Sequence, residues 1–90
     1  MMHAIVMGAT SGIGYEVAKI LASRGWRVGV AGRREDILAK MVAEKDGIVA
    51  YEVIDVTSPD AVDGMHNLID KLGGMDLYFH RSGIGYQNIE

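Results

Sequence analysis

Residues 3–14 read HAIVMGATSGIG, and this stretch decides the fold of the chain. The apolar run from His3 to Met7 predicts a buried strand, and the glycines at positions 8, 12 and 14 let the backbone turn sharply and approach a ligand closely. The helical pattern that follows leaves the N–H groups of its first turn facing an incoming anion. A strand, a glycine-rich turn and a helix in this order are suited to a phosphate, and a dinucleotide is the expected ligand.

The rest of the chain alternates between strand and helix patterns. Strands are predicted over residues 3–7, 26–31, 48–54 and 77–79, and the third of these is nearly unbroken in its apolar character, as in a strand covered on both faces. Helices are predicted between them, the last one starting at Ser58-Pro59. Their expected inward residues are Ile13, Val17, Ile20 and Leu21, then Ile37, Leu38, Met41 and Val42, then Val62, Met65, Ile69 and Leu72.

This alternation predicts an α/β fold, a Rossmann-like doubly wound parallel sheet of about four strands with three helices. Right-handed crossovers make 3-2-1-4 the expected strand order. We expect residues 1–90 to form a single, partial dinucleotide-binding domain of the Rossmann type. A sheet of this order binds ligands outside the carboxyl ends of its strands, where the winding reverses. Gly8, Arg33, Asp55 and Gly83 all follow predicted strands, so we expect them to converge on one edge.

Composition excludes several classes of function. The formal net charge of -3 and the lack of a basic stripe argue against a nucleic-acid surface. Without cysteine there is no thiolate site, and His3, His66 and His80 have no metal-binding spacing, so we expect no metal. No apolar run has the length of a membrane span or of a signal peptide, and we therefore expect a soluble, cytoplasmic protein that does not bind membranes.

Four segments together carry a resemblance to a known family. The first turn has the spacing G-x-x-x-G-x-G, and it is followed in order by Gly32-Arg33-Arg34, by Asp55-Val56-Thr57, and by a segment from Gly74-Met75-Asp76-Leu77 to Ser82-Gly83. In this combination the chain resembles the short-chain dehydrogenase/reductase family over essentially its whole length. The resemblance implies an NAD(P)-dependent oxidoreductase of which this chain is the amino-terminal, cofactor-binding part.

The resemblance also implies which residues contact the cofactor. The first turn would wrap the pyrophosphate and ribose, Asp55 would bond the adenine with Val56 lining its pocket, and Ser82 and Gly83 would pass close to the ribose. Asp55 has a simpler alternative interpretation, as an acid that ends a loop. The implied turn residues are Gly8, Thr10, Ser11, Gly12, Ile13 and Gly14.

Cofactor choice is expected to depend on the exit of the second strand. Many NAD-dependent members have an acidic residue there that accepts from the ribose hydroxyls, whereas this chain has Gly32 followed by Arg33. A guanidinium can hold a 2′-phosphate through two parallel charge-assisted bonds. We therefore expect NADP(H) rather than NAD, with Arg33 as the main contact and Arg34 as a secondary one; the alternative is that both are solvated residues at a helix start.

The chain departs from the family pattern in two places. His80-Arg81-Ser82-Gly83 stands where members usually have Asn-Asn-Ala-Gly, and Met7 replaces a threonine before the first glycine. The serine, tyrosine and lysine that catalyse hydride transfer in the family lie beyond this segment, so no catalytic residue is expected within these 90 residues. Tyr15 and Lys19 share the catalytic spacing, but they belong to the helix at the pyrophosphate and are interpreted as ordinary helix residues.

Two other functional classes stay open from the sequence. One is a stand-alone nucleotide-binding or interaction module that pairs with another chain, or with a second copy of itself, through an uncovered strand-four edge at Leu77 to Phe79. The other is a methyltransferase, whose glycine loop binds adenosine without a pyrophosphate. The glycine spacing and the pair Arg33-Arg34 favour a phosphate-bearing ligand over the latter.

Overall fold

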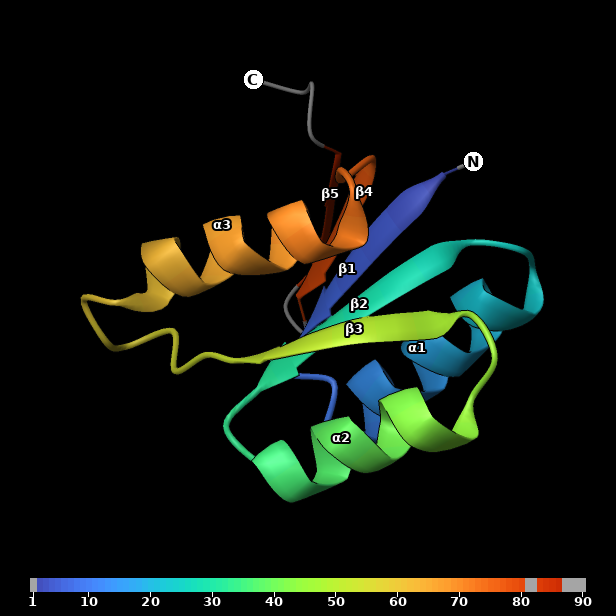
Figure 1. Ribbon diagram of the computed structural model, residues 1–90, viewed down its shortest axis with the longest axis horizontal. Helices are drawn as coiled ribbons and strands as arrows, with labels where there is room; N and C mark the ends of the chain where they lie inside the picture. Colours follow the sequence, from blue (N-terminus) through green and yellow to red (C-terminus); the bar gives the residue numbers. More distant parts are fainter. Residues whose placement is uncertain (1, 81–82, 87–90) are drawn as a thin grey trace.

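A twisted sheet with helices on both faces forms the structure (Figure 1). The computed structural model describes residues 2–80 and 83–86. Its strands are β1 (His3–Met7), β2 (Arg27–Gly32), β3 (Ile48–Val53), β4 (Leu77–His80) and β5 (Gly83–Tyr86), and its helices are α1 (Gly12–Ser23), α2 (Glu35–Glu44) and α3 (Ala61–Leu72).

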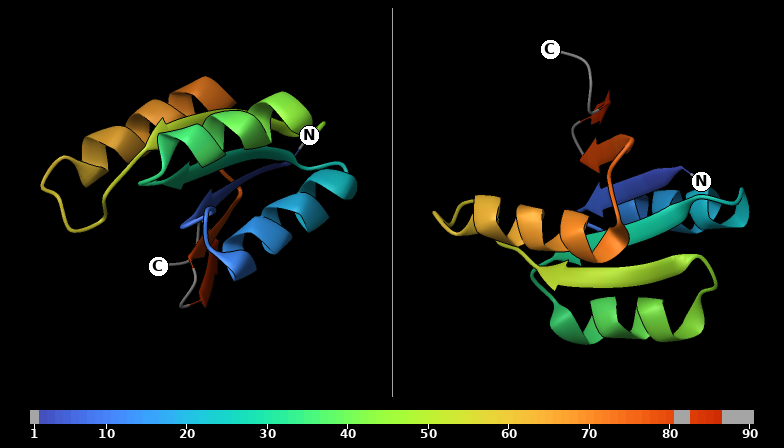
Figure 2. Two further views of the ribbon diagram at one scale, coloured as in Figure 1. Left: turned by 90° about the horizontal axis from the view of Figure 1, so that it is seen from below. Right: turned by 45° about the horizontal axis from the view of Figure 1, so that its top comes forward.

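The strand order is β3-β2-β1-β4-β5, and the first four strands run parallel. The predicted order 3-2-1-4 is therefore confirmed, as is the doubly wound arrangement, with α1 and α2 on one face and α3 on the other (Figure 2). Because the four strands are parallel, the segments that follow them all emerge at the same edge of the sheet.

The predicted open edge at strand four is wrong. β5 pairs with β4 in antiparallel register, with Leu77 opposite Tyr86 and Phe79 opposite Ile84. Only two residues separate the strands, too few for the crossover that a parallel neighbour would need, so the chain can return only in the antiparallel direction. Leu77 to Phe79 are thus paired on both sides, and the outer strands of the described sheet are β3 and β5.

Two apolar clusters hold the helices to the sheet, one on each face. Val6, Val28, Val30 and Leu38 belong to the cluster beneath α1 and α2, while Leu68 and its neighbours join α3 to the opposite face. α3 packs closely because β2 has a glycine beneath it: a Cβ on Gly29 would lie 3.1 Å from Leu68 Cδ1. No helix among the described residues is long and apolar enough to cross a membrane.

The predicted inward faces are right for α2 and partly wrong for the other two helices. Leu38 and Met41 of α2 are buried, with Ile37 and Val42 packed beside them. On α1, however, Ile13 and Ile20 are exposed, because the helix lies so close to the first turn that Gly14 and Ala18 face the sheet.

α3 also differs from the prediction at its first turn. The helix starts at Ala61 rather than at Ser58-Pro59, after a turn in which the Ser58 hydroxyl accepts from the Asp60 N–H. Val62 is 64% exposed, whereas Leu68, which the pattern missed, is fully buried.

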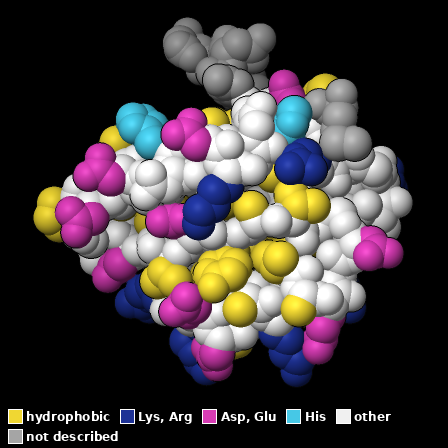
Figure 3. Space-filling model, in the orientation of Figure 1, with side chains coloured by type: hydrophobic (Ala, Val, Ile, Leu, Met, Phe, Trp, Pro, Cys, Tyr) yellow, Lys and Arg dark blue, Asp and Glu magenta, His cyan; other side chains and the backbone are white. Residues whose placement is uncertain are grey.

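The neighbouring β3 is also less buried than its apolar sequence predicts. Val49 and Val53 are exposed because this strand is outermost and only partly covered. The space-filling view shows hydrophobic side chains on this face of the molecule, interspersed with acidic and basic ones (Figure 3). Helices α2 and α3 thus cover the two faces of β3 as predicted, but only in part, because β3 is the outermost strand.

The burial differences on α3 predict opposite outcomes for two substitutions. Leu68→Ala removes a fully buried side chain between α3 and the sheet and should lower the free energy of unfolding by about 2–5 kcal/mol. Val62→Ala on the exposed face should change it by less than about 0.5 kcal/mol. Denaturant titrations followed by circular dichroism measure both, and an equal loss in the two variants would contradict the packing of α3.

Candidate functional site

The turn after β1 is fastened to the end of β2. Gly8 adopts a positive φ of 75°, and the N–H groups of Gly8 and Ala9 both donate to the Ala31 carbonyl oxygen, at 2.9 and 3.0 Å. A residue with a side chain is strained at such a φ, so glycine is favoured there. The turn is thereby held at the carboxyl edge of the sheet, with α1 leading away from it.

Ser11 closes the turn and caps α1. Its hydroxyl donates to the Gly8 carbonyl oxygen at 2.8 Å, and the Gly14 N–H donates back to the same hydroxyl oxygen at 3.3 Å. Helix geometry leaves the N–H groups of Gly12 and Ile13 without an intrahelical acceptor. These amides, together with the positive end of the helix dipole, favour an anion at this point.

Two glycines of the turn have different tasks. A Cβ on Gly14 would overlap the Gly8 carbonyl oxygen, so glycine is needed there for α1 to lie against the turn. A Cβ on Gly12 would meet no protein atom within 4 Å. The missing side chain at position 12 therefore serves no packing purpose within the described structure, and it leaves open space at the start of α1.

A hollow of about 270 Å³ lies beside this turn and draws its lining from the ends of all four parallel strands. It brings together many of the predicted site residues, and His80 joins them although the sequence analysis assigned it no role. The lining residues are Met7, Gly8, Thr10, Ser11, Arg33, Ile54, Asp55, Val56, Thr57 and His80. A second hollow of about 340 Å³, between α1 and α2, shares Thr10 and Ser11 and adds Gly12.

Asp55 is held in place by its own loop. One carboxylate oxygen, Oδ1, accepts from the Thr57 hydroxyl at 2.7 Å and from the Thr57 N–H at 3.0 Å. These bonds, with a smaller contribution from the positive charge of Arg33, hold the pKa of Asp55 below its usual range. Asp55 is therefore a fixed carboxylate at neutral pH, and it can accept a hydrogen bond from a ligand.

Other predicted residues lie outside this hollow. Arg34 is exposed and its Nε lies 3.7 Å from Asp36 Oδ1, while Ile13 is 66% exposed on α1. Gly83 starts β5 opposite His80, which in turn lies opposite Met7, so Gly83 is at the same edge of the sheet. Ser82 lies outside the described residues. The described part of the chain has no group of three histidine, aspartate or glutamate side chains able to hold a metal ion.

The contribution of His80 to the lining could have been inferred from its position. It is the last residue of β4, and the carboxyl ends of the parallel strands all meet at this edge. No sequence motif points to a histidine at this position. Strand-end position was therefore a better guide to the lining than resemblance to a motif.

Comparisons with a family model and with individual proteins all point to the same family. The sequence model of a family described as short chain dehydrogenase matches residues 2–90. An uncharacterized oxidoreductase of Staphylococcus saprophyticus is 33% identical over 86 residues, and an A-factor type gamma-butyrolactone 1′-reductase of Streptomyces virginiae is 38% identical over 82. These matches cover 90% and 87% of this chain but 37% and 32% of the relatives, so the chain spans about a third of their length.

A solved structure shows the same likeness in three dimensions. A variant of actinorhodin polyketide ketoreductase, crystallised with NADPH, superposes with a TM-score of 0.74 at 33% sequence identity. The match covers 88% of this chain and 32% of the ketoreductase.

Substitutions at Gly14 and Gly12 should affect folding stability and cofactor binding separately. Gly14→Ala forces a methyl group against the Gly8 carbonyl and should cost about 1–3 kcal/mol of unfolding free energy. Gly12→Ala should leave stability within about 1 kcal/mol, but it fills the open space at the start of α1 and should weaken NADPH binding about tenfold or more. Denaturant titration and NADPH fluorescence titration measure the two effects. Unchanged NADPH affinity in Gly12→Ala would show that no ligand lies there.

Proposed function

This chain belongs to the short-chain dehydrogenase family, and on that basis we propose that it is the NADP(H)-binding portion of an oxidoreductase. The whole enzyme transfers a hydride between the nicotinamide and an alcohol or carbonyl substrate. The observation that carries the proposal is the hollow that joins the glycine turn to Arg33 and Asp55 at one edge of the sheet.

The residues of this site suit a dinucleotide phosphate. The first-turn amides of α1 and the open space at Gly12 accept the pyrophosphate, and Ser11 keeps the turn in shape. Asp55 presents a carboxylate to the adenine, and Val56, about half exposed, offers an apolar surface beside it. When bound, the cofactor supplies the hydride chemistry; the residues of this chain bind it and orient it.

NADP(H) is favoured over NAD by the exit of β2. Arg33 lines the hollow and is exposed at its rim, where its guanidinium is available to a 2′-phosphate. A Cβ on Gly32 would make only ordinary contacts, the nearest at 3.5 Å with Thr10, so the backbone does not require glycine there, yet this chain has no acidic residue at that position. The NADPH in the similar ketoreductase agrees with this choice.

Arg33 and Gly32 offer a direct test of cofactor preference. Arg33→Ala should weaken NADPH binding about tenfold or more, through loss of charge-assisted bonds, and leave NADH binding nearly unchanged. Gly32→Asp should go further and favour NADH, because its carboxylate repels the 2′-phosphate and accepts from the ribose hydroxyls. Arg34→Ala is the control, with a smaller loss expected since Arg34 pairs with Asp36 outside the hollow. Tighter binding of NADH than NADPH by the unaltered chain would refute the preference.

Binding without turnover is expected for these 90 residues alone. In the family the catalytic serine, tyrosine and lysine follow the segment that corresponds to residues 80–83, so we place none of them within these 90 residues. We therefore expect a measurable NADPH affinity but no steady-state oxidation of NADPH with ketone or aldehyde substrates, followed by absorbance at the nicotinamide band. Turnover above the rate of a heat-denatured sample would contradict this assignment.

A further inference from the structure

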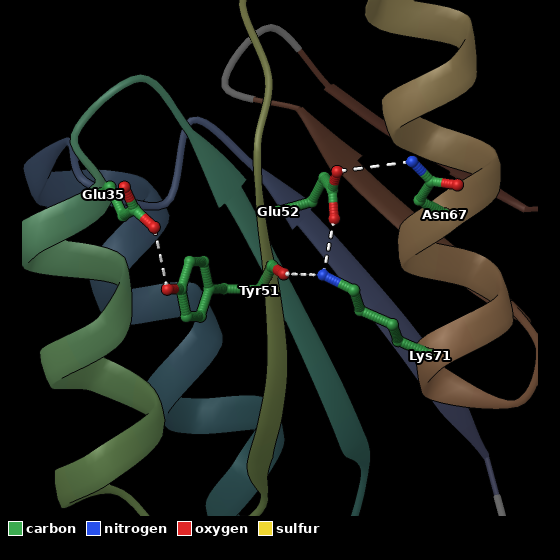
Figure 4. Close-up of polar contacts among 5 residues, drawn as sticks. All are labelled: Glu35, Tyr51, Glu52, Asn67 and Lys71. Carbon is green, nitrogen blue, oxygen red and sulfur yellow. Dashed lines mark hydrogen bonds and ion pairs between the residues drawn. The ribbon is translucent and has the colours of Figure 1, made fainter.

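A polar network crosses the outer edge of the sheet and contacts the helix that follows Arg33 (Figure 4). The Tyr51 hydroxyl of β3 donates to Glu35 Oε2 at 3.0 Å, and Glu35 is the first residue of α2. From the other side, Lys71 Nζ of α3 donates to the Tyr51 carbonyl oxygen at 3.0 Å and lies 2.6 Å from Glu52 Oε1. Tyr51 thus links β3 to both flanking helices.

Glu35 is the part of this network that bears on cofactor binding. It lies only two positions after Arg33, the residue proposed to hold the 2′-phosphate. If the Glu35 carboxylate turned toward Arg33, it would repel a phosphate and compete with it for the guanidinium. Its location therefore matters more than that of an ordinary surface acid.

The Tyr51 bond places the Glu35 carboxylate outside the cofactor hollow. Glu35 and Tyr51 line a separate depression of about 330 Å³, together with Glu52, Val53 and Lys71. None of these five residues lines the hollow that contains Arg33. Figure 4 shows the Glu35 carboxylate directed toward the Tyr51 ring at the edge of the sheet.

We propose that Tyr51 is a positioning residue for cofactor selectivity: its hydroxyl keeps the Glu35 carboxylate at the outer edge of β3, away from Arg33 and the 2′-phosphate. The inference rests on the NADP(H) binding proposed above. It adds a residue that contacts no part of the cofactor and acts through Glu35.

The ionisation of Tyr51 is consistent with this task. The hydrogen bond to Glu35 is the main cause of a raised pKa for the Tyr51 hydroxyl, with the negative charge of Glu35 adding to it. The hydroxyl therefore keeps its proton at neutral pH and stays a donor to the carboxylate. Cofactor-binding measurements at neutral pH are therefore made with the hydrogen bond between Tyr51 and Glu35 in place.

The test is a double-mutant cycle on the ratio of the NADPH and NADH dissociation constants. Tyr51→Phe removes only the hydroxyl, and it should weaken NADPH binding about three- to tenfold, the range of one surface hydrogen bond, with less than about a twofold change for NADH. Loss of stability alone would weaken both cofactors equally and leave the ratio unchanged. The ratio therefore separates positioning from a merely structural role.

Two companion variants complete the experiment. Glu35→Gln removes the charge that Tyr51 restrains, so Tyr51→Phe should have no further effect on the ratio in that background. Lys71→Met disrupts the α3 side of the same network and should lower stability without changing the ratio.

The outcomes distinguish this inference from the function on which it rests. If the unaltered chain binds NADPH no better than NADH, the proposed function fails and the inference with it. If it prefers NADPH but Tyr51→Phe keeps the same ratio, or shifts the ratio equally in the Glu35→Gln background, only the inference is overturned. A shift in Lys71→Met as large as in Tyr51→Phe also overturns it, because the effect would then come from a loosened edge.

Discussion

The structure depends on one carbonyl oxygen that accepts two hydrogen bonds. Ala31, near the end of β2, receives the N–H groups of both Gly8 and Ala9, and this fixes the turn after β1 to the neighbouring strand. Gly14 then allows α1 to start in direct contact with that turn. The position of the helix amides relative to Arg33, two residues after Ala31, follows from this short connection. The proposed anion site and the proposed selectivity site are therefore linked by this short connection.

The parallel strands determine which residues can share a site. Each crossover returns the chain to the same end of the sheet, so segments far apart in sequence, such as Gly8, Arg33 and Asp55, reach one hollow without any direct bond between them. Local bonds then orient the individual groups. Thr57 orients Asp55, Ser11 shapes the turn, and both interactions span three residues or fewer. Long-range topology and short-range capping thus have separate roles.

Sequence reasoning predicted the order of the parallel strands and most of the hollow, because strand and helix periodicity and the glycine turn are local signals. It failed where the packing distance between elements determines which residues are buried. Ile13 and Ile20 match a helical apolar stripe, but the close approach at Gly14 turns small residues toward the sheet instead. Arg33 could be ranked above Arg34 from the sequence, but the ion pair that Arg34 makes with Asp36 outside the hollow is seen only in the structure. The pairing of β5 with β4 depends on a connection of two residues that carries no recognised turn motif.

Lys71 of α3 donates a hydrogen bond to a backbone oxygen of Tyr51, in the outermost strand β3. Ile54 donates its N–H to Gly32 of β2, so alternation along the strand points the Tyr51 backbone groups outward, toward solvent. A lysine ammonium already occupies that outward oxygen. A polypeptide approaching to extend the sheet at Tyr51 would have to displace the lysine ammonium. At this point of β3 a charged side chain therefore stands where an added strand would have to bind.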